Sequence, residues 1–202
     1  MDERIKAVID ADFFRKLTEH ENGIGLFLRV MDDLGMDPIM HEYVAETELK
    51  DNVYLQKLLN MGKLSIVHYG DYLKEEDHDE YEKYFRAAYE KINYFDFPEE
   101  DIYQYAARGE SLGEIRSLYM ARKRGYIYFM SDDAGARTLA KSFFSSKRAL
   151  EVKTLFDAFV MCKERNTKLK WKDINPTVTN AMRKKQKKIL ELKAMYADKG
   201  EK

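Results

Sequence analysis

The sequence predicts an α/β protein with a central parallel sheet of about five strands and helices on both faces. Short apolar segments alternate with helical segments along most of the 202 residues, which is typical of a parallel sheet covered by helices. The chain length suits one domain with an appendage. We expect a main domain over residues 1–170 and a basic helical extension over residues 171–202.

Three strands and the helices between them are predicted in the first part of the chain. Residues 5–11 (IKAVIDA) are short, apolar and β-rich, and a helix over 13–20 follows them. Apolar residues at helical spacing predict a helix over 26–35, which Gly35 is suited to end. After a short strand over 38–40, we expect one helix over 41–62. The apolar run LSIVHY predicts a strand over 64–69.

The second part of the chain repeats the alternation. Residues 71–95 are helical from about Asp77, and residues 96–110 form a loop or a broken helix. Ser111 and Glu114 have the spacing of a capping box, so a helix over 111–125 should begin there. A strand over 126–130 (YIYFM), a helix over 132–144, a strand over 149–154 and a helix over 154–165 follow. The last helix is expected to begin at Asn175–Pro176.

Composition and charge narrow the class of protein. The sequence has no apolar run of about 18 residues, so no membrane span is expected, and its first residues do not resemble a signal peptide. Its single cysteine, Cys162, favours a reducing compartment, and we expect a cytoplasmic protein. Residues 178–202 contain eight Lys/Arg against three Asp/Glu. The tail is therefore basic, although the whole chain has a net charge of −1.

Acidic residues follow two of the predicted strands. Asp10 and Asp12 come at the end of the first strand, and Asp132 and Asp133 follow the fourth. Ligands of parallel sheets gather at the carboxyl ends of the strands. Acids that converge there from separate elements suit a hard divalent cation such as Mg²⁺ or Mn²⁺. This cation would also screen the repulsion between the adjacent carboxylates.

Helix capping is the simpler role for some of these acids. Either Asp132 or Asp133 can cap the helix that begins near Ala134, and capping is the better interpretation of Asp12. Asp10 differs, because it follows an apolar strand where an unpartnered acid costs free energy. For Asp10 we therefore favour a functional role.

Four sequence segments, in order, resemble the PIN domain. They are VIDAD, VAETEL, GEIRSLYMARKRG and YFMSDDAGARTLAK. The last two are the most specific, because in one PIN-like subgroup a Gly-Glu pair opens a helix and Asp-Asp/Glu-x-x-Ala-Arg opens the next. The resemblance covers roughly residues 5–165. It is strong over 111–141 and loose between 60 and 110.

The resemblance implies a three-layer α/β/α fold and Mg²⁺- or Mn²⁺-dependent ribonuclease activity on single-stranded RNA. Asp10 matches the first acid of the family, and Glu114 matches the third. The second acid matches Glu46 or Glu48, and the fourth matches Asp132 or Asp133, of which a Ser/Thr-x-Asp pattern favours Asp133. Metal ligation is expected of Asp10, Glu114 and the Asp132–Asp133 pair. Many such proteins are toxins held by an antitoxin protein, and others belong to phage or defence systems. A homodimer is possible.

Several basic residues are candidates for contact with RNA. Arg137 lies one helical turn after Asp133 and can contact a phosphate, although pairing with an acid is the simpler role. The tail cations Arg183, Lys184 and Lys185 can hold a nucleic-acid backbone or form a solvated helix face.

Two alternatives to the nuclease are kept open. One is a PIN-fold module that binds RNA or protein without cutting. The other is a phosphatase like the haloacid dehalogenases, with Asp10 as nucleophile and Asp12 as general acid. Phe14 and the Gly135-Ala136-Arg137 sequence depart from the motifs of that family.

Overall fold

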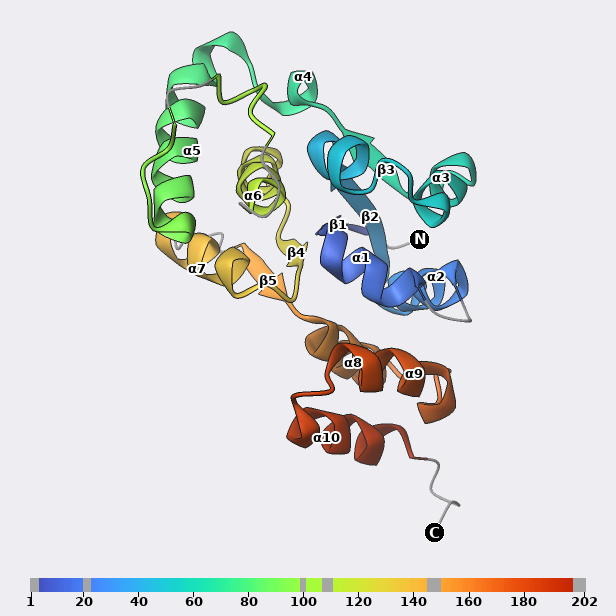
Figure 1. Cartoon of the computed structure of the whole chain (residues 1–202). Coiled ribbons are helices and arrows are strands. Elements are labelled where there is room, and N and C mark those ends of the chain that lie inside the picture. Colours follow the sequence, from blue (N-terminus) through green and yellow to red (C-terminus); the bar gives the residue numbers. More distant parts are fainter. Residues whose placement is uncertain (1–3, 20–22, 99–100, 107–110, 145–149, 198–202) are drawn as a thin grey trace.

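A computed structural model (Figure 1) describes residues 4–19, 23–98, 101–106, 111–144 and 150–197 of the chain. Its centre is a five-stranded sheet in the order β3-β2-β1-β4-β5, and all four strand pairs are parallel. The strands are β1 (Ile5–Ile9), β2 (Met36–His41), β3 (Ser65–Val67), β4 (Tyr128–Met130) and β5 (Glu151–Lys153). The prediction of a parallel α/β fold is thereby confirmed.

The helical elements between and after the strands are as follows: α1 (Ala11–Thr18), α2 (Ile24–Asp33), the π-helix η1 (Val44–Glu48), α3 (Val53–Asn60), α4 (Tyr69–Tyr72), the 3₁₀ turn η2 (Glu75–Asp77), α5 (His78–Asn93), α6 (Leu112–Arg124), α7 (Ala134–Phe143), α8 (Leu155–Glu164), α9 (Trp171–Ala181) and α10 (Gln186–Tyr196). Within the described residues, no helix is long and apolar enough to cross a membrane.

Helices cover both faces of the sheet, because alternate residues of each strand point to opposite sides. Ala7 and Ile9 of β1 belong to a core that contains residues of α1, α2, α3, α8, α9 and α10. Val8, between them, belongs to a second core formed with α5, α6 and α7. Figure 1 shows these two groups of helices on opposite sides of the strands. The result is a three-layer α/β/α arrangement.

The C-terminal extension packs on the main body. Ile174 and Val178 of α9 and Leu192 of α10 are completely buried in the same core as α1 and α8. Tyr196, at the end of α10, donates a hydrogen bond of 2.6 Å from its hydroxyl to the Phe159 carbonyl of α8. These contacts fix the extension against α8.

The prediction of one helix over 41–62 is wrong. Its first part is η1, a wider turn in which the Leu49 amide donates to the Val44 carbonyl five residues earlier (2.9 Å). Asn52 then starts a new helix by accepting from the amides of Tyr54 and Leu55 (3.0 and 3.1 Å). Because of this break, the side chains of Glu46 and Glu48 do not point in the directions expected for one continuous helix.

The start of the last helical region was also predicted wrongly. Helix α9 begins at Trp171, and Asp173 accepts a hydrogen bond of 2.8 Å from the Lys170 amide. Pro176 therefore lies inside the helix rather than at its start, where it cannot donate to the carbonyl of Lys172. Burial of Ile174 and Val178 on either side offsets this loss.

Two capping predictions are wrong as well. Ser111 has a left-handed backbone (φ 52°) and caps no amide with its side chain, so it does not form a capping box with Glu114. Asp10, not Asp12, caps α1, while Asp12 lies in the first turn and pairs with Lys16. Some predicted positions lie outside the described residues. They are residue 20 of the helix predicted over 13–20, residue 149 of the strand predicted over 149–154, and residues 99–100 and 107–110 of the predicted loop.

His41 at the end of β2 makes the stability of the fold depend on pH. Its Nδ1 accepts from the Tyr43 amide (2.9 Å), and its Nε2 lies 2.8 Å from the Tyr72 hydroxyl. These contacts suit a neutral ring that donates from Nε2. Burial, with smaller effects of the positive charges of Arg116 and His68, lowers the pKa of His41 to about 3.

We expect the stabilisation by neutral His41 to be complete above about pH 6.5, where the unfolded ring is also neutral. As the pH falls towards about 3, only the unfolded chain gains a proton. The free energy of unfolding should then fall by about 1.4 kcal/mol per pH unit relative to that of His41→Asn. Urea unfolding of both proteins between pH 4.5 and 7.5 measures this, and a constant difference would contradict it.

Candidate metal centre

The carboxyl ends of β1 and β4 bring two acids to one hydroxyl. Asp10 follows β1 and is 2% exposed. One of its oxygens accepts from the Ala11 amide (2.8 Å), and the other accepts from the Ser131 hydroxyl (3.1 Å). The same hydroxyl accepts from the Asp133 amide (3.1 Å). Asp133 caps α7 through the Gly135 amide, so the two acids are held on either side of buried Ser131.

Glu114 comes to this edge from the first turn of α6. Burial, together with the negative charges of Asp10, Glu48 and Asp133, raises the pKa of its carboxyl to about 8. An acid is ordinarily favoured at a helix N-terminus. Here the loss of water and the neighbouring carboxylates outweigh that effect.

Glu48 comes from the last residue of η1 and rests against the start of α6. It accepts a hydrogen bond from the Gly113 amide, and its Oε1 lies only 2.3 Å from where a Cβ on Gly113 would be. Burial raises its pKa to about 7, and the charge of Asp10 adds to this rise, whereas Arg15 and Arg116 oppose it. Residue 113 must therefore lack a side chain for the Glu48 carboxylate to occupy its position.

Asp10, like Glu114, interacts with all the other members of the group. Burial raises its pKa to about 6, partly offset by the hydrogen bonds from Ser131 and Ala11. Asp133 also raises its pKa, and Asp10 in turn raises those of Glu48 and Glu114. We call Asp10, Glu48, Glu114 and Asp133 the edge carboxylates.

A hard divalent cation fits the chemistry of the edge carboxylates. They offer only oxygen donors, and the raised pKa values of Asp10, Glu48 and Glu114 indicate that negative charge at this edge lacks sufficient compensation. Among the described residues, no three of them have oxygens that all lie within 4.8 Å of one another. In this arrangement a cation would reach some of these side chains only through water, and Mg²⁺ usually keeps several waters.

The sequence left two choices open, Glu46 or Glu48 and Asp132 or Asp133. The structure places the two residues of each pair in different surroundings. Asp132 lies outside the edge carboxylates: it forms an ion pair of 2.9 Å with Lys16 and accepts from the Leu155 amide (3.0 Å), so it joins α1 to the start of α8. Glu46 is exposed and also lies away from them, because the π turn directs it differently from Glu48. Of these alternatives, Asp133 and Glu48 are the residues that belong to the edge carboxylates.

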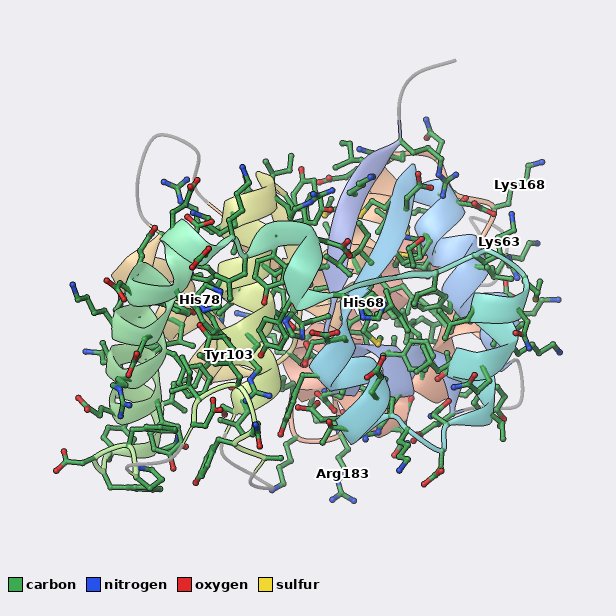
Figure 2. The ribbon with its side chains drawn as sticks, turned by 90° about the horizontal axis from the view of Figure 1, so that it is seen from above. Lys63, His68, His78, Tyr103, Lys168 and Arg183 are labelled. Atoms are coloured by element: carbon green, nitrogen blue, oxygen red, sulfur yellow. The ribbon has the colours of Figure 1, made fainter. Side chains whose placement is uncertain are left out.

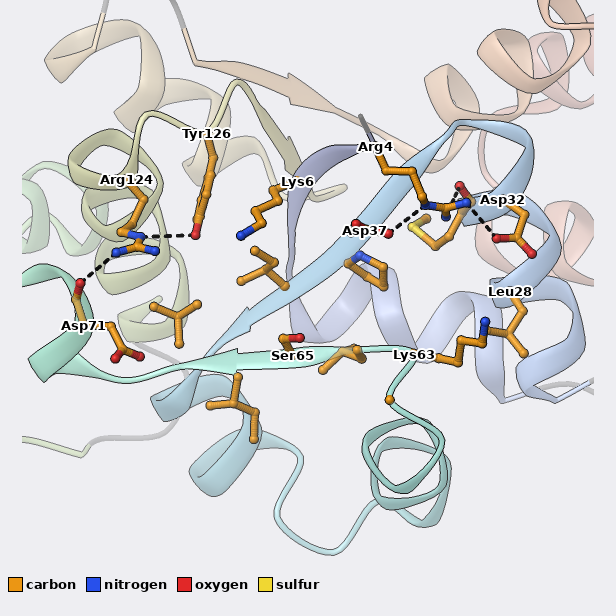
Figure 3. Close-up of a pocket in the computed structure, with 17 residues that line it drawn as sticks. Arg4, Lys6, Leu28, Asp32, Asp37, Lys63, Ser65, Asp71, Arg124 and Tyr126 are labelled. Carbon is orange, nitrogen blue, oxygen red and sulfur yellow. Dashed lines mark hydrogen bonds and ion pairs between the residues drawn. The ribbon is translucent and has the colours of Figure 1, made fainter. Parts of the chain in front are cut away.

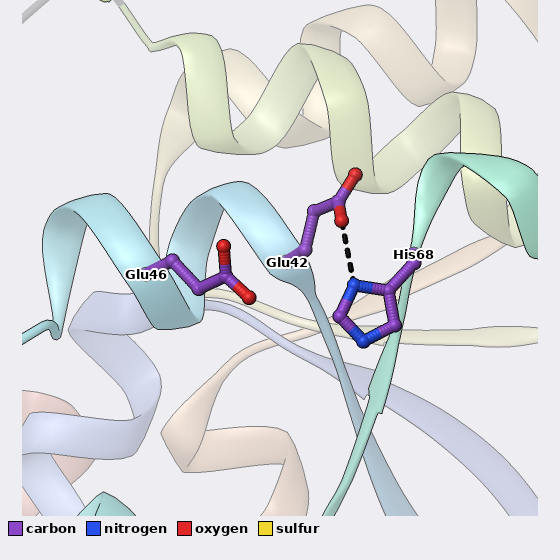
Figure 4. A group of neighbouring side chains, drawn as sticks. All are labelled: Glu42, Glu46 and His68. Carbon is purple, nitrogen blue, oxygen red and sulfur yellow. Dashed lines mark hydrogen bonds and ion pairs between the residues drawn. The ribbon is translucent and has the colours of Figure 1, made fainter.

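Glu46 belongs to a second group with Glu42 and His68, whose ligand atoms all lie within 4.8 Å of one another (Figure 4). The Glu42 carboxylate is already engaged, because it accepts from the Tyr69 amide (2.9 Å) and lies 2.6 Å from His68 Nδ1. This pairing raises the pKa of His68. No sequence pattern indicates this group, since its members come from η1 and from the positions directly after β2 and β3.

The predicted RNA-contacting cations are exposed. Arg137 is exposed on α7, with Nη1 3.5 Å from the Asp132 carbonyl. Lys184 and Lys185 are exposed before α10, as is Arg183. In Figure 2, β3 runs from the side of Lys63 to that of His68, and Arg183 lies beyond His68. Arg183 is thus on the side of the carboxyl ends of the strands.

An open groove of about 560 Å³ lies along β3 and over part of β1 and β2 (Figure 3). Its lining extends from Ser65 to Val67, the whole of β3. It contains both basic and acidic side chains and none of the edge carboxylates.

Sequence reasoning did not identify the residues that hold the acids in place. Ser131 entered only as part of a motif, yet its hydroxyl joins Asp10 to Asp133. The Nη2 of Arg15 donates to the Glu48 carbonyl (2.7 Å) and fixes the end of η1. A polar residue between an apolar strand and an acid is a sequence signal that could have identified Ser131. Nothing in the sequence indicates the contact of Arg15 with Glu48.

Comparisons of the chain with protein-family models, with curated proteins and with solved structures found no significant match.

Gly113→Ala is expected to weaken Mn²⁺ binding by about tenfold to a hundredfold, the usual effect of displacing a group that orients a ligand. The new Cβ would occupy the place of Glu48 Oε1. Alanine is a better helix former than glycine, so stability should change little. Calorimetric titration with Mn²⁺ and thermal unfolding measure the two effects. Unchanged Mn²⁺ affinity would show that Glu48 has no part in the site.

Proposed function

We propose that this chain is a PIN-like nuclease that uses Mg²⁺ or Mn²⁺ to hydrolyse phosphodiester bonds in single-stranded RNA. The observation that supports this most strongly is the convergence of the four edge carboxylates. They come from the end of β1, from η1, from α6 and from the start of α7, and burial together with neighbouring carboxylates raises the pKa values of Asp10, Glu48 and Glu114. Such crowding of buried acids is costly unless a cation offsets it.

The residues present can perform the chemistry without a protein nucleophile. A bound divalent cation supplies charge neutralisation on the phosphate and activation of water. Asp10 and Glu114 are the most buried members and would hold the ion at the end of β1. Glu48 and Asp133 flank them and would orient the waters around the ion. The Ser131 hydroxyl keeps Asp10 and Asp133 in fixed positions.

RNA as substrate is supported by exposed positive charge, of which Arg137 lies beside the Asp132–Asp133 pair. Arg137 follows Asp133 by one helical turn, and Arg183 lies on the carboxyl side of the sheet. Since phosphate contacts account for most sequence-independent affinity, these cations would hold the backbone of the substrate. A role as the toxin of a toxin–antitoxin pair would add a small protein partner that blocks this surface.

Matched pairs of variants test the proposal. A fluorogenic single-stranded RNA is incubated with Mn²⁺ and each protein. We expect Glu48→Gln and Asp133→Asn to lower cleavage by about 10²-fold or more, the usual effect of losing a group that stabilises the transition state. Glu46→Gln and Asp132→Asn, on neighbouring residues outside the edge carboxylates, should retain most activity.

Other outcomes would favour the alternatives. RNA binding without Mn²⁺-dependent cleavage would favour a silent RNA-binding module. Turnover of a phosphate monoester with an aspartyl-phosphate trapped on Asp10 would favour the dehalogenase-like phosphatase. The pairing of Asp12 with Lys16 weighs against the latter, because it engages the proposed general acid.

A further inference from the structure

Two aromatic side chains are unusually exposed after the end of α5. Tyr94 is 92% exposed and Phe95 is 54% exposed. Fully exposed aromatic rings forgo the burial that normally stabilises them. An adjacent pair of this kind suits a flat, unsaturated ligand.

The backbone of Tyr94 has a strained conformation. Tyr94 has a left-handed conformation (φ 62°, ψ 21°) and ends α5 through its amide, which donates to the Glu90 carbonyl (3.0 Å). This position usually contains glycine, because a Cβ is unfavourable there. Strained residues of this type concentrate at functional sites. The Tyr94 side chain therefore occupies a position where its backbone conformation costs free energy and its ring makes few contacts.

The aromatic pair follows a part of α5 that packs against the start of α7. The start of α6 lies beside the middle of α5, where the Tyr84 hydroxyl donates to the Ile115 carbonyl (3.0 Å). Further along α5, Ile92 lies 3.4 Å from where a Cβ on Gly135 would be. The carboxylate of Asp133 caps α7 by accepting from the Gly135 amide. Tyr94 is two residues beyond Ile92, a span of at most about 7 Å along the chain.

We propose that Tyr94 and Phe95 form a stacking platform for an unpaired nucleobase next to the scissile phosphate. This inference rests on the proposed function, which supplies the phosphodiester. Every base has an aromatic face, so the platform would grip single strands without regard to sequence. Paired bases are stacked inside a duplex and would not reach it. The platform thus gives this site its preference for single-stranded substrate.

The Phe95 ring is held for this role by a neighbour. It packs edge-on against buried Tyr89, with ring centroids 5.5 Å apart and an interplanar angle of 87°. Tyr89 is anchored in the α5–α6 core. Phe95 is therefore partly oriented before any base arrives, which lowers the entropic cost of stacking.

The test uses a ten-nucleotide single-stranded oligouridylate and an abasic strand of the same length. Affinities for the full chain are measured by fluorescence anisotropy, with Ca²⁺ replacing Mn²⁺ to limit cleavage. We expect the unmodified protein to bind the base-bearing strand about tenfold more tightly than the abasic strand. Tyr94→Gly and Phe95→Ala should lose this preference, whereas affinity for the abasic strand stays the same.

Controls separate the platform from a structural role and from the proposed function. Tyr94→Gly should unfold at the same temperature as the unmodified protein or higher, since glycine suits the left-handed backbone. Phe143→Ala removes a partly exposed ring at the far end of α7, about 14 Å from Asp133, and should keep the preference. Stabilisation by Mn²⁺ should persist in Tyr94→Gly, and its absence from the unmodified protein would count against the metal centre rather than the platform.

Two results would overturn the platform. One is equal affinity of the unmodified protein for both strands. The other is a Tyr94→Gly variant that keeps the base preference but loses self-association in sedimentation, since the pair would then be a protein contact.

Discussion

Asp10→Asn is expected to abolish stabilisation by Mn²⁺ and to lower RNA cleavage by about 10²- to 10³-fold. The metal-free protein should nevertheless melt at the same temperature or higher. Asparagine retains one oxygen that can cap α1, and its side-chain NH2 can donate to the Ser131 hydroxyl in place of the second oxygen. It also removes the charge that raises the pKa values of Glu48 and Glu114. A gain in intrinsic stability with a loss of function indicates a site built for a ligand.

Asp12→Asn is the matched control for this change. Asp12 is two residues away, is exposed and pairs with Lys16. Its neutralisation should leave the Mn²⁺ response unchanged, with a loss of stability below about 0.5 kcal/mol. Thermal unfolding of the three proteins at 0 and 5 mM Mn²⁺ makes the comparison. If Asp10→Asn retained the full Mn²⁺ shift, Asp10 would have no part in holding the ion.

Arg116→Met should destabilise the fold by about 3 kcal/mol, because it leaves buried carbonyls without a donor. The Arg116 side chain is 1% exposed, and one of its Nη atoms donates to the carbonyls of Ile102 and Tyr105 (2.8 and 2.7 Å). Its guanidinium also lies 4.1 Å from the centroid of the Tyr43 ring. The side chain thereby ties residues 101–106 to α6, just beyond Glu114.

Arg122→Met on the same helix is the control. Arg122 is exposed, so its replacement should change the free energy of unfolding by less than about 0.5 kcal/mol. Urea unfolding measures both variants. A similar small effect for Arg116→Met would show that water replaces the guanidinium and that segment 101–106 does not depend on it.

The sequence predicted the sheet and its acidic edge because both follow from local patterns. Short apolar runs defined the strands, and Asp10 and Asp133 follow β1 and β4 directly. Parallel neighbours then place their carboxyl ends together. Glu114 was found through a motif, since the helix that carries it begins after a long irregular segment whose path is not determined by local preferences.

The choice between neighbouring acids could not be made from the sequence. Glu46 and Glu48 would lie on different sides of any helix, but which one faces the sheet depends on the π turn, which a regular helical pattern does not indicate. A Ser/Thr-x-Asp pattern favoured Asp133 over Asp132, but the role of Asp132 depends on its contacts with Lys16 and Leu155, far away in the chain. The exposure of Tyr94 and Phe95 could not be predicted from the aromatic-rich segment 81–95, because exposure depends on tertiary packing.

The most direct test of the account is a crystal structure of the protein soaked in Mn²⁺, with the ion located by its anomalous signal. The account predicts an ion between Asp10 and Glu114, with Glu48 and Asp133 contacting it directly or through water. An ion found only at Glu42, Glu46 and His68, with none at the edge carboxylates, would contradict it.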